Sequence, residues 1–106
     1  MIPDSISPKD VDVLQKLKQQ EEIGEQGFAV YYRGDQETGM ELMKQALEDS
    51  KADIGTLHNS YLREHAEQLM KAMSQAIQTY MKHPSDENLD ALKSGAESYK
   101  TFLNQY

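Results

Sequence analysis

Histidine and carboxylate side chains, the usual donors of metal sites and acid–base pairs, come together at one place in this chain. His58, Glu64, His65 and Glu67 lie within a span of ten residues. On a helix His58 and His65 would be two turns apart on one face, too far to share one ion. The Glu-x-x-His and His-x-x-x-His spacings that place two ligands on one metal do not occur. We therefore interpret these histidines as structural and predict no metal site.

Acidic residues in the first half give a second candidate for metal chemistry. Asp10 and Asp12, or Glu21, Glu22 and Glu25, could bind a hard cation. A Ca²⁺ loop needs oxygen ligands at alternating positions around a glycine, and that spacing is missing, so we interpret these carboxylates as solvated helix faces. The sequence also has no cysteine, no Gly-x-Ser-x-Gly elbow and no glycine-rich phosphate loop. It predicts a protein that is not an enzyme and has no cofactor and no catalytic residue.

Aromatic residues form the sharpest candidate for a binding surface. Phe28, Tyr31 and Tyr32 belong to the densest apolar cluster, and rings with polar handles are enriched at interfaces. Core packing is the alternative, although Tyr31 and Tyr32 cannot both face the same way, so we expect one of them at the surface. With the preceding acids, which would steer a basic partner, the predicted partner-binding residues are Phe28, Tyr31, Tyr32, Glu21, Glu22 and Glu25.

Methionines provide a second binding candidate. Met40 and Met43, with Met70 and Met73, either fill the core or line an adaptable groove for a partner helix.

The elements that must position these residues are helices. Ser7 followed by a proline predicts the start of the first helix, and Gly24 and Gly27 weaken it, so we expect it to end or bend near Ile23. A further helical stretch runs through the aromatic cluster to Gly34. A helix capped by Asp35 is predicted over about 36–51, with a break at 53–56.

The second half, residues 57–106, predicts a long helical hairpin. Apolar residues recur at spacings of three and four on both arms, and Pro84 separates the arms. A helix is expected from Leu57 to Lys82, and Ser85 caps the last one. The stripes are Leu62, Ala66, Leu69, Met73, Ile77 and Tyr80, then Leu89, Leu92, Ala96, Tyr99 and Leu103. The whole chain is predicted to be all-α, one antiparallel bundle of about four helices over 1–106, with residues 1–7 as a flexible lead-in.

Composition limits the partners. The chain of 106 residues has a formal net charge of −7, and residues 1–53 carry twelve acidic against six basic side chains. This surface disfavours nucleic acids and anionic membranes and suits a basic protein. No apolar run approaches the roughly 18–20 residues of a membrane span, and no secretory signal is recognisable. We expect a cytoplasmic protein, and the absence of cysteine also fits export by a dedicated secretion machine.

Two stretches resemble known families. Residues 75–104, with the turn His83-Pro84-Ser85-Asp86 followed by Leu89, are similar to the helix–turn–helix of type III secretion needle subunits. This resemblance implies a helical hairpin that assembles with copies of itself. Residues 27–47, with Gly27, Gly34 and Gly39, resemble a single tetratricopeptide-type hairpin, although no second repeat is present.

Three functions follow as hypotheses. The first is a protein–protein interaction module, namely a small acidic helical adaptor, chaperone or regulatory subunit. The second is a self-assembling structural subunit, present as a homodimer or larger homo-oligomer. The third is an acidic inhibitor that mimics nucleic acid on a basic protein.

Overall fold

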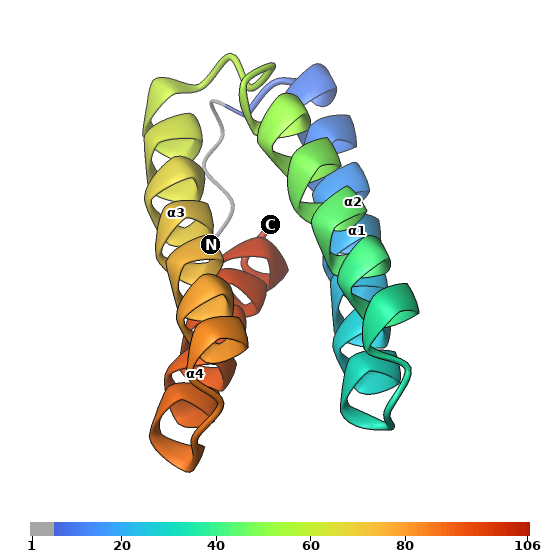
Figure 1. Ribbon diagram of the computed structural model, residues 1–106. Coiled ribbons are helices and arrows are strands. Elements are labelled where there is room, and N and C mark those ends of the chain that lie inside the picture. The colour runs from blue at the N-terminus through green and yellow to red at the C-terminus, as the bar shows by residue number, and fades with distance from the viewer. Residues whose placement is uncertain (1–5) are drawn as a thin grey trace.

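The computed structural model describes residues 6–106, which form four α-helices (Figure 1). In chain order these are α1 (Pro8–Tyr32), α2 (Gln36–Ile54), α3 (Ser60–Lys82) and α4 (Asp86–Asn104). The predicted all-α class and the predicted number of helices are confirmed. Residues 1–5 of the expected lead-in lie outside the described residues, whereas Ser7 of the same segment caps α1.

Each of the four helices begins at a polar side chain that accepts a hydrogen bond from the backbone N–H three residues further on. Ser7, Asp35, Asn59 and Ser85 make these bonds at 3.1 or 3.2 Å, and such caps satisfy N–H groups that the helix leaves free. The predicted start of the third helix at Leu57 is wrong. Residues 55–59 form a loop, and Leu57 is buried in the core from that loop.

The first helix continues through its glycines to Tyr32, so the predicted end near Ile23 is wrong. Gly27 faces α2 at close range, since a Cβ atom on it would lie 2.9 Å from Leu42 Cβ. On the other helix, a Cβ atom on Gly39 would lie 2.5 Å from the backbone nitrogen of Tyr31. The glycines therefore allow α1 and α2 to pack at close range, and this packing offsets their low helix propensity.

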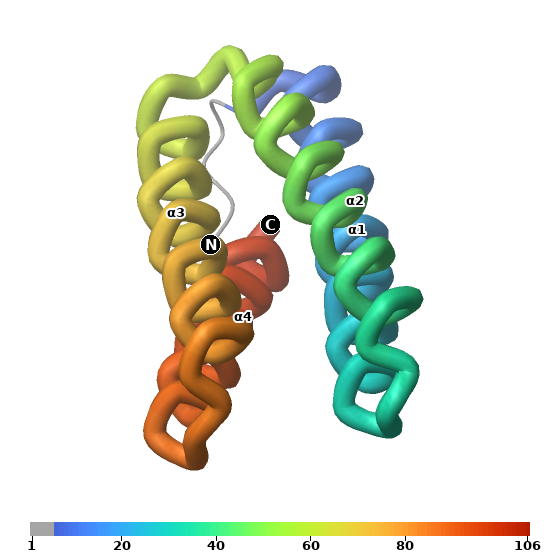
Figure 2. The backbone as a smooth tube through the Cα atoms, viewed as in Figure 1, coloured from blue at the N-terminus to red at the C-terminus, as the bar shows by residue number. Residues whose placement is uncertain are grey.

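The four helices form two antiparallel hairpins, α1 with α2 and α3 with α4 (Figures 1 and 2). The hairpins contact each other less than the helices within each hairpin do. They converge at the 55–59 loop and diverge toward the turns at 33–35 and 83–85 (Figure 2). The shape is accordingly elongated, with extents of 43 × 23 × 19 Å.

The core includes the loop that joins the two hairpins and residues from all four helices. Its buried members are Leu14, Leu17, Ile54, Leu57, Leu62, Ala66, Met70, Met73, Tyr99, Phe102 and Leu103. These include half of the predicted stripe of α3 and two of the five residues of the predicted stripe of α4, Tyr99 and Leu103. No helix between residues 6 and 106 is both long and apolar enough to cross a membrane.

Candidate functional site

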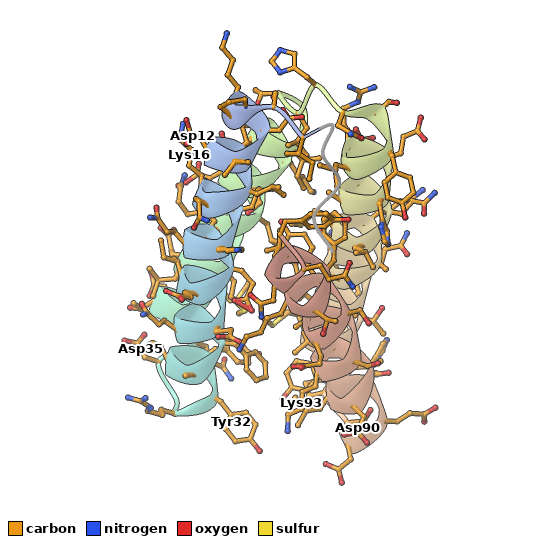
Figure 3. The ribbon with its side chains drawn as sticks, turned by 180° about the vertical axis from the view of Figure 1, so that it is seen from behind. Asp12, Lys16, Tyr32, Asp35, Asp90 and Lys93 are labelled. Atoms are coloured by element: carbon orange, nitrogen blue, oxygen red, sulfur yellow. The ribbon has the colours of Figure 1, made fainter. Side chains whose placement is uncertain are left out.

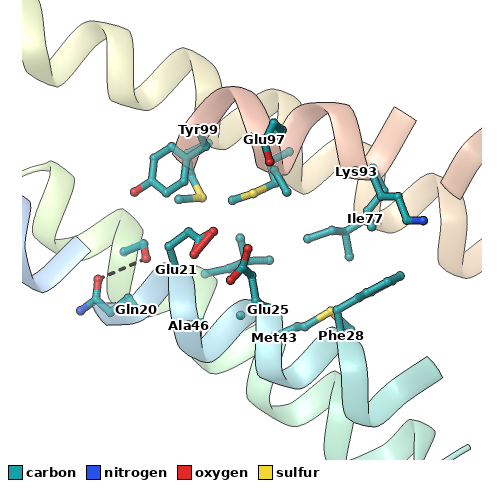
Figure 4. A pocket seen from close by; sticks show the side chains of 17 residues that line it. Gln20, Glu21, Glu25, Phe28, Met43, Ala46, Ile77, Lys93, Glu97 and Tyr99 are labelled. Carbon is teal, nitrogen blue, oxygen red and sulfur yellow. Dashed lines mark hydrogen bonds between the residues drawn. The ribbon is translucent and has the colours of Figure 1, made fainter. Parts of the chain in front are cut away.

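A cleft of about 390 Å³ lies between the two hairpins (Figure 4). All four helices line it, and its walls are mainly apolar. Met70, Met73 and Tyr99 belong both to these walls and to the core. The cleft is thus a continuation of the core into the space where the hairpins diverge. Its apolar lining consists of Phe28, Met43, Ala46, Leu47, Met70, Met73, Ile77, Leu92 and Ala96.

Three of the nine apolar residues of this lining are methionines, and they are also buried, so the structure fits both sequence interpretations of these three, core packing and groove lining. Met43, Met70 and Met73 are buried in the cleft walls, on α2 and α3. Met40 is different, because it is 49% exposed and does not line the cleft. Flexible thioether side chains can change rotamer to fit guests of different shape, so the walls are adaptable.

Charged residues of α1 and α4 border the apolar walls. Glu21 and Glu25 line the cleft from α1, and Glu97 and Lys93 line it from α4. Lys100 Nζ lies 3.2 Å from Glu25 Oε1 and so links the two hairpins. The border is acidic, and it includes two of the three glutamates that the sequence predicted as a steering surface. The third, Glu22, is exposed and lies outside the cleft lining.

Glu21 is the unusual member of this acidic border. Its Oε1 atom is buried and has no hydrogen-bond partner among residues 6–106. Burial raises the pKa of Glu21 to about 7, repulsion from Glu25 adds to the shift, and the charge of Lys100 opposes it. A carboxyl group in this environment binds protons readily and, when ionised, attracts a cation.

A polar group of residues lies beside Glu21 at the same end of the cleft. Gln20 Nε2 donates to Asp53 Oδ2 at 2.6 Å. Ser50 Oγ donates to Gln20 Oε1 at 3.1 Å, the bond drawn in Figure 4. Tyr99 is fully buried, and its hydroxyl finds no hydrogen bond of good geometry in the described part of the chain. Burial raises the pKa of Tyr99, the Ser50 hydroxyl opposes the shift, and the charges of Glu21 and Asp53 add to it.

The predicted aromatic cluster is divided by the structure. Phe28 lines the cleft, and its ring lies 6.1 Å from that of Tyr80 on α3. Tyr31 is half-buried and packs edge-on against the same ring at 6.4 Å, so both residues hold α1 to α3. Tyr32 is 65% exposed and points away from the helices (Figure 3). The expectation that one of the two tyrosines reaches the surface is therefore confirmed for Tyr32.

The histidines are separated by the fold. His58 lies in the loop before α3, with Nδ1 3.4 Å from Asp10 Oδ1, and so does not share a helix with His65. His65 packs against the Phe102 ring at 4.5 Å. Asp10 is only 1% exposed, which corrects its interpretation as part of a solvated face. Within residues 6–106 no group of three His, Cys, Asp or Glu residues has a geometry that could hold a metal ion.

Tyr99 and its polar neighbours were missed by the sequence interpretation, which placed Tyr99 in an apolar stripe. A tyrosine at a core position is the one signal that pointed to a polar group in this interior, because its hydroxyl needs a partner when buried.

Comparison of this chain with models of protein families, with curated proteins and with solved structures gives no significant match. The cleft is therefore the feature from which a function can be proposed.

Proposed function

We propose that this protein is a non-enzymatic interaction module, an adaptor or chaperone, that binds an amphipathic helix of another protein between its two hairpins. The observation that carries the proposal is the methionine-rich apolar cleft. Apolar surface of this kind is normally buried by packing, and a concave apolar site with a few polar groups is the usual form of a binding site.

The dimensions of the cleft define how such a helix would bind. A helix with its side chains is about 10 Å across, so three turns of helix exceed a cavity of 390 Å³ several-fold. The backbone of the partner therefore stays at the mouth, and side chains spaced at i, i+3, i+4 and i+7 enter. Met43 and Met73 on opposite hairpins adjust to those side chains.

Charge favours a basic partner. The chain has a net charge of −7, and three glutamates line the cleft against one lysine, Lys93. An acidic mouth accelerates encounter with a basic helix and repels acidic ones, and the acceleration decreases as salt is added.

Ala96→Leu tests the proposal, because Ala96 is a small, half-buried residue of the cleft wall. Short helical peptides are selected on the full chain from a display library, and their affinities are measured by calorimetry. We expect the selected peptides to carry the i, i+3, i+4, i+7 apolar pattern, and Ala96→Leu to weaken them about tenfold or more because it fills the cleft. Ala91→Leu, an equal change at an exposed position of α4 outside the cleft, leaves the affinity unchanged.

Peptides that bind both variants equally well would place the binding surface elsewhere and overturn the proposal. Light scattering across a wide range of concentration is the companion measurement. If the chain associates with itself and Ala96→Leu suppresses this association, the occupant of the cleft is a second copy of this chain and not a different protein.

A further inference from the structure

We infer that the polar end of the cleft is a lysine-binding site, where the ammonium group of a lysine from the partner helix binds between Glu21 and Tyr99. This inference rests on the proposed function and adds the identity of one partner residue. It follows from two buried polar groups that line the same end of the cleft from different hairpins (Figure 4).

Glu21 on α1 and Tyr99 on α4 each have a buried oxygen without a hydrogen-bond partner among the described residues. They lie across the cleft from each other at the same end (Figure 4). Buried polar groups in proteins nearly always have a partner, because leaving one unsatisfied destabilises the folded state. Two such groups on opposite walls of one cavity indicate a site for a hydrogen-bonding guest.

The chemistry of the two oxygens selects the guest. An ionised carboxylate only accepts hydrogen bonds, and the Tyr99 oxygen accepts one as well, so the guest must donate at least twice. An ammonium group has three donors and no acceptor, and its charge complements Glu21. The planar guanidinium of arginine has five donors and needs more acceptors than these two.

The walls that lead to the two oxygens fit the rest of a lysine side chain. Met70, Met73 and Leu92 line the same cavity and would surround the four methylene groups, as apolar surfaces often do for lysine. The lysines of this protein leave the site open to a guest. Lys100 is bonded to Glu25 at 3.2 Å and not to the buried Oε1 of Glu21.

The experiment uses octylammonium as a probe, because it combines an ammonium group with an alkyl chain, and 1-octanol as its uncharged counterpart. Binding to the full chain is followed by NMR of the methionine methyl groups, below the micellar concentration. We expect octylammonium to shift the signals of Met43, Met70 and Met73 and to leave that of Met40, outside the cleft, in place. Glu21→Gln weakens octylammonium about tenfold or more, since a charge-assisted bond is lost, and leaves octanol unaffected.

Two further variants refine the test. Tyr99→Phe removes only the hydroxyl and weakens octylammonium about tenfold, because the hydrogen bond that an ammonium group donates to this oxygen is charge-assisted. Glu22→Gln, a charge-matched change at an exposed neighbour, leaves the affinity within about twofold, since exposed charges contribute little. Circular dichroism confirms that each variant is folded.

The pH dependence gives an independent readout. Glu21 must be ionised to bind the cation, so the affinity for octylammonium rises as the pH increases through 7. The charged groups that influence this site are Glu22 and Glu25 on α1, Asp53 on α2, and Lys93, Glu97 and Lys100 on α4. Tyr99 on α4 stays neutral because burial raises its pKa, and α3 contributes apolar residues to the lining. Glu21→Gln must therefore abolish the rise if Glu21 is its source.

Three results would overturn the inference. These are equal binding of octylammonium and octanol, equal binding of octylammonium by the wild type and Glu21→Gln, or no change in the cleft methionines. None of these results decides the proposed function, which is tested separately by the effect of Ala96→Leu on peptide binding.

Discussion

At the scale of single residues, Asp10 connects the start of α1 to the loop between the hairpins. Its carboxylate accepts hydrogen bonds from the backbone N–H groups of His58 and Asn59, both at 2.9 Å. Burial by itself would raise the pKa of Asp10, but the two backbone donors and His58 outweigh it and lower the pKa. A buried, ionised side chain thus holds the 55–59 loop where the hairpins converge.

Asp10→Ala removes this connection and leaves two backbone N–H groups without their acceptor. We expect the free energy of unfolding to fall by about 2–4 kcal/mol, measured by urea denaturation. Asp12→Ala is the matched control, because Asp12 is exposed two residues away, and it changes stability by at most about 0.5 kcal/mol. Equal losses in both variants would contradict the role given to Asp10.

Glu21 makes stability depend on pH in the opposite sense to a paired carboxylate. Its pKa is about 7 in the folded chain against a usual value of 4.5, so the folded state binds more protons between these values. Stability is then fully present below about pH 4.5 and is lost as the pH rises through 7.

Glu21→Gln is expected to remove the loss of stability that occurs as the pH rises. Because Glu21 is partly exposed, the difference between the variant and the wild type is expected to grow by only about 1 kcal/mol over this range, after allowance for solvent screening. Thermal unfolding at several pH values measures it, with Glu22→Gln as the control. Parallel pH profiles of the wild type and Glu21→Gln would show that the carboxyl group of Glu21 is not perturbed.

At the scale of the elements, the hairpin of α1 and α2 is held by close contact between backbones. A Cβ atom on Gly39 would lie within 2.6 Å of backbone atoms of Tyr31 and Gly27, and backbone cannot rotate away as a side chain can. Gly95 is different, although it lies on the apolar face of α4, three residues after Leu92 and four before Tyr99. It faces Met73 of α3, and an added Cβ would make an ordinary contact at 3.5 Å.

Gly39→Ala and Gly95→Ala are therefore expected to act in opposite directions. The first forces the helices apart and destabilises the chain by about 2–3 kcal/mol. The second gains helix propensity and stabilises it by about 0.5–1 kcal/mol. Denaturation of both variants measures the pair, and a stabilised Gly39→Ala protein would show that the two helices can separate at no cost.

At the scale of the whole molecule, the stability of the two hairpins is unevenly distributed along their length. The joining loop and the helix ends next to it belong to the core, whereas the hairpins diverge toward the turns at 33–35 and 83–85 (Figure 2). Regions with fewer buried contacts open at lower free energy than the core.

Native-state hydrogen exchange should therefore be graded along the long axis. We expect backbone amides near the two turns to exchange at least about tenfold faster than those next to the 55–59 loop, as local opening predicts. Occupation of the cleft by a bound helix would reduce this difference, since the helix joins the hairpins where they diverge. Uniform protection along both hairpins without a ligand would contradict this distribution of stability.

Much of the fold could be predicted from the sequence, because it depends on local interactions. The caps Ser7, Asp35 and Ser85 and the breaks around Gly34 and Pro84 act within a few residues, so the sequence predicts the helices that they delimit. Errors arose where distant contacts prevail. Helix α1 continues through Gly24 and Gly27 because α2 packs against it. Leu57 lies in the loop and not in α3 because Asp10, 47 residues earlier in the chain, holds that loop.

The candidate site could likewise be predicted from the sequence only in part. From the sequence alone follow an acidic chain, a helical architecture and the residue types of the site, including Glu21, Glu25, Phe28 and the methionines. Only the tertiary structure decides that these residues line one cleft, that Tyr99 faces Glu21 across it, and that Tyr32 and Glu22 remain outside. The reason is physical: the sequence periodicity determines which face of each helix is apolar, whereas the divergence of the hairpins depends on packing between residues far apart in the chain.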